Sequence, residues 1–197
     1  MQVIIKTNYN ELVDEAVRHI TSLIKAKPDA VLCLPTGNTP TGVYEKLIEL
    51  YNKKEIDFSR IRTFNLDEYV DIPATHPSSF RYYMFKTFFD HVNIKQENIH
   101  FPPSELGGPG IPDITGRCLE YEELIRQAGG LDMAILGIGR NGHIGFNEPT
   151  SSLQSRTRVK TLTGDTLRDN DIEFEGERLP DLTVTMGIGT IMEARSV

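Results

Sequence analysis

Residues 131–149 read Leu131-Asp-Met-Ala-Ile-Leu-Gly-Ile-Gly-Arg-Asn-Gly-His-Ile-Gly-Phe-Asn-Glu-Pro149. The apolar run up to Leu136 follows a double glycine and is too short for a helix, which predicts a buried strand. Behind it, closely spaced glycines let the backbone turn tightly and approach a ligand without a side chain in the way. A strand that feeds such a loop is typical of an α/β sheet with a ligand site at its edge.

Gly137, Gly139 and Gly142 also match the dinucleotide pattern G-x-G-x-x-G. That pattern requires a helix that begins at the third glycine and holds the pyrophosphate at its N-terminus. Here Gly145 and Pro149 bracket a segment that is too short for such a helix. The loop is therefore expected to present side chains to a ligand.

Strand-like and helical patterns alternate along the rest of the chain. Strands are expected at residues 1–5, 30–34, 60–66, 99–101, 131–136 and 182–186. Helices are expected to begin at Asn10, Thr39, Ser78 or Ser79, Asp113 and Thr190. Residues 155–162 alternate only in part, and residues 164–179 are polar and suit a mobile flap over a site.

This alternation implies right-handed βαβ units, and hence a largely parallel sheet with helices on both faces. A chain of 197 residues fits one domain, 1–197. Loops that follow parallel strands share one sheet edge, where ligands bind. Four are expected to meet there: 36–39, Asp67, 137–148 and 187–189.

Acidic residues outnumber basic ones by 28 to 21 with no Lys/Arg block, so neither nucleic acid nor an anionic membrane is an expected partner. No stretch approaches the roughly 20 apolar residues of a membrane helix. Cys33 and Cys118 lie in apolar and helical patterns and are expected to be buried thiols. With no signal-like N-terminus, the expected setting is the cytoplasm.

The loop Thr36-Gly-Asn-Thr39 precedes a helix that has Pro40 in its first turn. Backbone N–H groups, two hydroxyls and the helix dipole make it a natural phosphate cradle. It lacks the lysine and spacing of a P-loop. The alternative is a plain strand-to-helix turn.

Asp67 ends the third expected strand, where a shielded carboxylate can have a raised pKa and act as a general base. A capping or salt-bridged aspartate is the alternative, and Glu68 is the neighbouring acid.

His143 lies in the glycine-rich loop, and an imidazole exchanges protons near neutral pH. Glu148 or Asn141 could orient its ring. A zinc site would need an H-E-x-x-H or paired-cysteine pattern, which the sequence lacks, so no metal is expected. A cradle, a carboxylate and a histidine fit proton transfer on a phosphorylated sugar, such as aldose–ketose isomerisation.

These motifs resemble the glucosamine-6-phosphate deaminase (isomerase) family. The matching stretches are 34–40, 65–69, 137–149, 151–158 and 185–190, which together run across nearly the whole chain. The resemblance implies a Rossmann-like three-layer α/β fold and, without a cofactor, conversion of glucosamine 6-phosphate to fructose 6-phosphate with release of ammonia. Such an enzyme combines isomerase and hydrolase chemistry.

The resemblance also assigns roles. Asp67 would be the enolisation base, His143 the ring-opening proton carrier, and Asn141 and Glu148 its supporting residues. Residues Thr36, Gly37, Asn38 and Thr39 would hold the substrate phosphate.

The sequence departs from the family pattern in three places. Asn141 stands where some members have aspartate, and other members also carry asparagine. Ile172 falls at the expected place of a flap arginine that binds phosphate, with Arg168 as the substitute. Members continue through another strand and a phosphate-binding lysine turn, and none of this follows Val197, so an incomplete sheet and weakened substrate binding are expected.

Residues Ser151, Ser152, Arg158 and Lys160 resemble the allosteric activator site of some members, which lies at subunit contacts in a homohexamer. A homo-oligomer is therefore an expectation, and a polar surface hairpin is the alternative interpretation of these four residues.

Two rival functions stay open. A 6-phosphogluconolactonase shares the fold and a similar loop, although stretches 65–69 and 145–149 favour the deaminase. The second rival is a sugar-phosphate sensor that binds without turnover.

Overall fold

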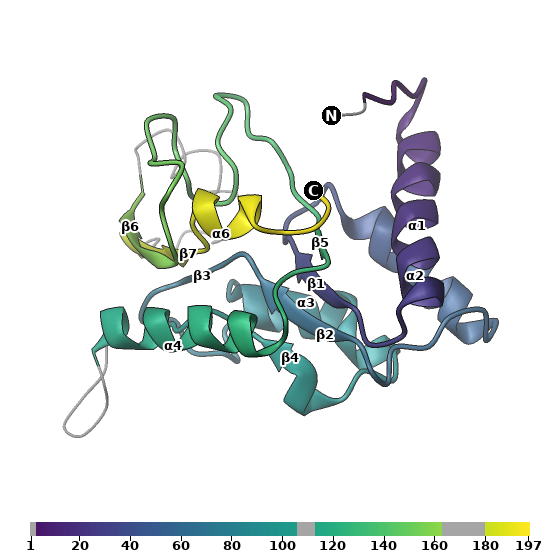
Figure 1. Cartoon of the computed structure of the whole chain (residues 1–197), viewed down its shortest axis with the longest axis horizontal. Coiled ribbons are helices and arrows are strands. Elements are labelled where there is room, and N and C mark those ends of the chain that lie inside the picture. The colour runs from purple at the N-terminus through teal and green to yellow at the C-terminus, as the bar shows by residue number, and fades with distance from the viewer. Residues whose placement is uncertain (1–2, 106–112, 163–179) are drawn as a thin grey trace.

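A computed structural model of the chain describes residues 3–105, 113–162 and 180–197. Its centre is a four-stranded parallel sheet in the order β4-β2-β1-β5 (Figure 1). The strands are β1 (Val31–Leu34), β2 (Arg62–Asn65), β4 (Ile99–His100) and β5 (Met133–Ala134). The parallel sheet expected from the sequence is confirmed.

Side chains alternate across the central strand β1, so each face of the sheet has its own core. Leu32 and Leu34 join the apolar cluster of α1 (Tyr9–Ala26), α2 (Thr41–Asn52) and α3 (Phe80–Thr87). Val31 and Cys33 join the cluster of α4 (Ile114–Gln127) and α6 (Ile188–Met192). The three-layer expectation is thereby confirmed.

A second sheet was not predicted. Strands β3 (Asp67–Tyr69), β7 (Leu182–Thr185) and β6 (Arg158–Thr161) form an antiparallel sheet in the order β3-β7-β6. Only Leu66 separates β2 from β3, so the chain changes sheets within one residue. Asp67 is therefore the first residue of a strand rather than a loop residue.

Two helix starts were predicted correctly. Ser79 caps α3 by accepting from the N–H groups of Arg81 and Tyr82, and Asp113 caps α4 by accepting from Gly116 N–H. Two short 3-10 turns, Phe89–His91 and Gln96–Asn98, follow α3 and lead into β4.

Three helix starts differ from the predictions. Asn8, not Asn10, caps α1, because its side chain accepts from Glu11 N–H. Pro40, not Thr39, is the N-cap of α2. Gly187 is the N-cap of α6, so Thr190 lies inside that helix, where its hydroxyl bonds the Glu122 carboxylate at 2.7 Å.

The strand expected at 1–5 is wrong for its described part. Residues 3–6 form no strand, and Val3 and Ile5 are largely exposed, because no described strand lies beside them to bury their side chains. The expected flap at 164–179, including Arg168, lies outside the described residues.

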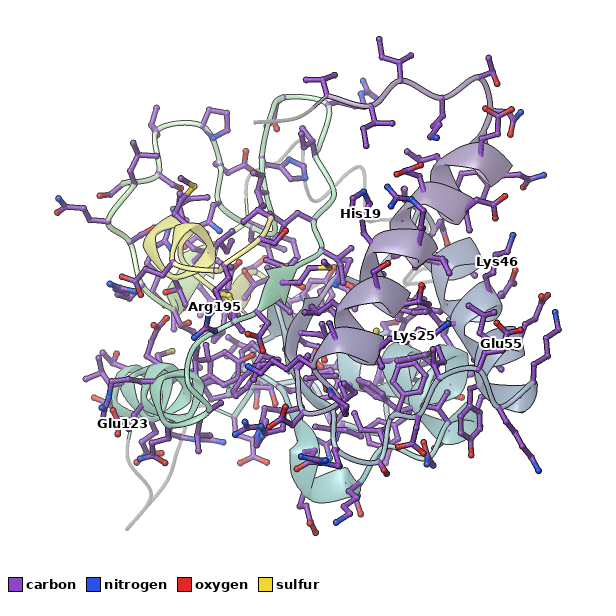
Figure 2. The ribbon with its side chains drawn as sticks, turned by 45° about the vertical axis from the view of Figure 1, so that its right-hand side comes forward. His19, Lys25, Lys46, Glu55, Glu123 and Arg195 are labelled. Atoms are coloured by element: carbon purple, nitrogen blue, oxygen red, sulfur yellow. The ribbon has the colours of Figure 1, made fainter. Side chains whose placement is uncertain are left out.

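Charged residues connect neighbouring elements of the fold. Asp132, buried before β5, accepts from Lys27 Nζ at 2.7 Å and from Arg195 Nη1 at 2.9 Å. Arg195 lies between α6 and the end of α4, and Lys46 on α2 forms an ion pair with Asp14 on α1 (Figure 2).

Cys33 and Cys118 are buried free thiols, as predicted. Burial raises the pKa of Cys118 to about 11. The cytoplasmic setting and the single-domain boundary stay predictions. Among the helices in the described ranges, none has the length and apolar character needed to cross a membrane.

Candidate active site

A hollow of about 480 Å³ opens at the carboxyl edge of the parallel sheet. Its lining includes residues 36–39, Asp67 and residues 137–140, 143, 145 and 146. Three of the four loops expected at this edge therefore meet there. A larger hollow, about 620 Å³, lies between α4 and α6 and is lined by none of the candidate catalytic residues.

The fourth loop, 187–189, does not line the hollow. It packs instead against the segment that precedes β6. A Cβ on Gly187 would lie 2.1 Å from the Ser155 carbonyl oxygen, so only glycine fits there. The expectation failed because β7 belongs to the antiparallel sheet, so the rule for parallel strand ends does not apply to it.

The loop of residues 36–39, here called the cradle loop, was expected to offer the free N–H groups of the following helix to a phosphate. The first-turn N–H groups of α2 are already engaged: Thr41 with Asn38 O, Gly42 with the Tyr9 hydroxyl, and Val43 with Pro40 O. An anion would therefore meet N–H groups of the loop rather than those of the helix. Gly37 has φ +94°, a conformation that favours glycine.

Asp67 is 7% exposed. Burial, with a smaller contribution from the neighbouring Glu68, raises its pKa to about 8. Its Oδ2 lies 3.2 Å from where a Cβ on Gly145 would stand, so the glycine lets the 137–149 loop close over this carboxyl group. A carboxyl group of this pKa exchanges protons near neutral pH.

Glu68 has a different environment. It accepts from Ser79 Oγ at 2.8 Å and from the N–H groups of Tyr69, Phe80 and Arg81 at 2.9 to 3.0 Å. Burial raises its pKa, and these hydrogen bonds oppose the rise. The capping role considered for Asp67 is thus filled by Glu68, at the N-terminus of α3.

His143 is connected to Glu148 through Asn141. The Asn141 side chain donates Nδ2 to Glu148 Oε2 at 2.8 Å, and its Oδ1 lies 2.8 Å from His143 Nδ1. Oδ1 also accepts from the His143 backbone N–H at 3.0 Å. Because Oδ1 is an acceptor, this contact favours the tautomer of a neutral ring that has its proton on Nδ1 and leaves Nε2 as an acceptor.

A glycine in this loop leaves room for the His143 ring. A Cβ on Gly139 would lie 2.1 Å from His143 Cε1, so the ring rests against the bare backbone. Asn147 anchors the loop by donating to the Ile144 and Met186 carbonyls at 2.9 and 2.8 Å. Of the three glycines in the G-x-G-x-x-G match, Gly139 is the one that makes room for the imidazole.

The four residues assigned to an allosteric site lie in two segments. Arg158 and Lys160 are on β6, and Ser151 and Ser152 lie in the preceding connection. Arg158 Nη1 donates to Asn147 Oδ1 at 2.9 Å, which connects β6 to the histidine loop. Their allosteric role stays a prediction.

Arg140 was not predicted from the sequence; it lines the hollow and is the one cationic Lys or Arg side chain among the described lining residues. Phe80 and Phe146 supply apolar walls and stack at 6.1 Å between ring centroids. The position of Arg140 within the glycine-rich loop was the available signal.

The fold and the site together define an α/β protein with a buried carboxyl group and a histidine side chain on one hollow at the carboxyl edge of a parallel sheet. The chain belongs to the family described as glucosamine-6-phosphate isomerases/6-phosphogluconolactonase, which matches residues 6–197. The resemblance stated from the sequence is confirmed.

Curated relatives named glucosamine-6-phosphate deaminase are similar along the whole chain. One from Thermoanaerobacter sp. (strain X514) is 49% identical over 199 residues, covering 100% of this chain and 76% of the relative. One from Shewanella woodyi is 48% identical over 198 residues, covering 100% of this chain and 73% of the relative.

Solved structures agree. One described as a monomeric glucosamine-6-phosphate deaminase superposes with a TM-score of 0.91 at 41% identity, covering 98% of this chain and 79% of the other. A 6-phosphogluconolactonase from Thermotoga maritima gives 0.68 at 23% identity, covering 96% and 77%, and shows the shared fold alone. Since the first of these is monomeric, the homo-oligomer expectation stays a prediction.

Proposed function

We propose that this chain converts glucosamine 6-phosphate and water to fructose 6-phosphate and ammonia. The relatives that match along its full length carry the name of this activity. The observation that carries the proposal is the joint placement of Asp67 and His143 on one hollow beside the cradle loop. These are the two proton-exchanging groups that the reaction needs.

The first step opens the sugar ring. His143 Nε2 takes the proton of the anomeric hydroxyl and delivers it to the ring oxygen as the C1–O5 bond breaks. Asn141 holds Nδ1–H, and Glu148 holds Asn141, so the basic nitrogen stays fixed in one tautomer. The open-chain aldehyde results.

The second step moves the carbonyl group. The Asp67 carboxylate removes the proton from C2 and returns a proton to C1, while O1 gains a proton and the amino nitrogen loses one, which converts the amino aldehyde to a 2-imine with a hydroxyl group at C1. Water adds at C2 and ammonia leaves, which gives fructose 6-phosphate. Water is consumed, so the overall chemistry includes a hydrolytic step, and no redox partner is required. We expect the raised pKa of Asp67 to suit both removal and return of a proton.

The substrate phosphate is assigned to the cradle loop. Loop N–H groups and the positive end of the α2 dipole favour an anion there. Arg140 adds a cationic side chain to the same hollow. Ser151, Ser152, Arg158 and Lys160 are proposed as an effector site, and Arg168 as a further phosphate ligand.

The test is incubation of the protein with glucosamine 6-phosphate and separate assays of ammonia and fructose 6-phosphate. We expect both products in equal amounts. Hydrolysis of 6-phosphogluconolactone without ammonia release would instead favour the lactonase. Saturable substrate binding with neither product at high protein concentration would favour the sensor.

A further inference from the structure

The cradle loop is held from outside by two tyrosines on different helices. Tyr9 of α1 donates its hydroxyl to Thr39 O at 2.7 Å. Tyr83 of α3 donates its hydroxyl to Gly37 O at 2.6 Å. Thr41 Oγ1 lies 3.2 Å from the Tyr83 hydroxyl and 3.4 Å from the same carbonyl oxygen.

The Gly37 carbonyl controls the direction of the next N–H group. In a trans peptide the C=O of one residue and the N–H of the next point in opposite directions. With its oxygen drawn to Tyr83, the Gly37–Asn38 peptide turns the Asn38 N–H away from that tyrosine. Asn38 lines the hollow and Tyr83 does not.

Glycine makes this arrangement easy to lose. Gly37 has φ +94° and carries no Cβ, so its backbone torsions, and with them the orientation of the adjacent peptide, are less restricted than those of other residues. A rotated peptide would present a carbonyl oxygen, the negative end of its dipole, to an anionic ligand. The loop sequence alone therefore does not determine the orientation of its N–H groups.

We infer that Tyr83 is a positioning residue for phosphate: its hydroxyl fixes the Gly37 carbonyl so that the Asn38 N–H is available to the substrate phosphate. This inference rests on the proposed function. Tyr83 is not among the residues that line the hollow, so its loss should weaken binding and leave the chemical step unchanged.

The test compares Tyr83→Phe with Tyr82→Phe. Each substitution removes one hydroxyl and keeps the ring, and the Tyr82 ring faces the Lys86 ammonium at 6.0 Å rather than the cradle. For Tyr83→Phe we expect KM for glucosamine 6-phosphate and Ki for inorganic phosphate to rise together by about three- to ten-fold, with kcat within about two-fold. Tyr82→Phe should match the wild type.

Unchanged KM and Ki in Tyr83→Phe, a fall in kcat alone, or equal effects in both variants would overturn the inference. If the wild type releases no product, the proposed function fails. The role of Tyr83 is then tested by calorimetric titration of the three proteins with inorganic phosphate. Binding weakened only in Tyr83→Phe supports the positioning role; equal or undetectable binding in all three proteins rejects it. Thermal unfolding of each variant confirms that it is folded.

Discussion

Asp67 and Glu68 are neighbours on β3, yet their carboxyl groups have opposite environments. Glu68 accepts four hydrogen bonds from α3 and its own strand, whereas Asp67 lines the hollow beneath Gly145 with a pKa raised to about 8. Successive residues of a strand point to opposite faces, so one acid stabilises a helix and the other faces the hollow. The register of β3 thereby separates a carboxylate that caps α3 from a carboxyl group that lines the hollow.

Asp67→Asn should abolish most turnover and leave binding intact. An amide keeps the shape of the side chain but cannot remove the C2 proton, so we expect kcat to fall by about 10²- to 10⁴-fold. The Kd for glucosamine 6-phosphate, measured by calorimetry, should stay within about three-fold of the wild type. Turnover at the wild-type rate would show that another group is the base.

The pH dependence of kcat/KM should report Asp67. The base acts as the carboxylate, so activity should rise with pH along an acid limb whose midpoint is near the pKa of about 8. In Glu68→Gln the neighbouring negative charge is absent, so the midpoint should move to lower pH. An acid limb that stays in place in Glu68→Gln would show that Asp67 does not control it.

The same raised pKa predicts how stability changes with pH. Folded Asp67 holds its proton up to about pH 8, whereas an unfolded aspartate loses it near pH 3.9. Between these values the folded state binds more protons than the unfolded state, so the free energy of unfolding falls as pH rises. Asparagine does not ionise, so the free energy of unfolding of Asp67→Asn should not show this fall with rising pH.

Urea unfolding at pH 5 and pH 8 measures the effect. The free energy of unfolding of Asp67→Asn minus that of the wild type should increase by up to about 4 kcal/mol from pH 5 to pH 8, at about 1.36 kcal/mol per pH unit. A constant difference between the two proteins would mean that Asp67 is ionised throughout the range.

Local sequence patterns were sufficient for the parallel sheet and much of the site. Buried runs such as 30–34 and the caps Ser79 and Asp113 are read from a few adjacent residues, and the structure has them in place. The loops at Thr36 and His143 follow parallel strands, so their convergence comes from topology alone.

The second sheet could not be predicted in this way. Pairing of Asp67 with Thr185 joins segments more than a hundred residues apart, and nothing near either residue specifies it. The roles of Asp67 and Glu68 depend on where the N-terminus of α3 lies, and the orientation of the cradle depends on Tyr83 from the same helix. Tertiary placement, not local propensity, decides these features.

Asn141→Leu tests the hydrogen bonds that connect Glu148 to His143 through Asn141. Leucine has similar size but cannot accept from Nδ1, so the imidazole is no longer held in one tautomer. We expect kcat to fall by about 10- to 100-fold, in line with loss of a group that orients a catalytic residue. Gln127→Leu, which removes a similar amide on the exposed face of α4, is the control. Equal activities of the two variants would contradict the role of Asn141.

Arg140→Gln tests the cation in the hollow. The substrate phosphate carries nearly two negative charges at pH 7, and a nearby guanidinium lowers the free energy of the bound state without touching the reacting carbons. We expect KM to rise by about three- to ten-fold with kcat nearly unchanged, and the wild-type KM to depend more steeply on salt than that of the variant.

Arg126→Gln is the matched control, because this arginine is ion-paired with Glu123 on α4 (Figure 2 labels Glu123). If Arg140→Gln and Arg126→Gln raise KM equally, the effect is one of net charge and Arg140 has no particular place in substrate binding.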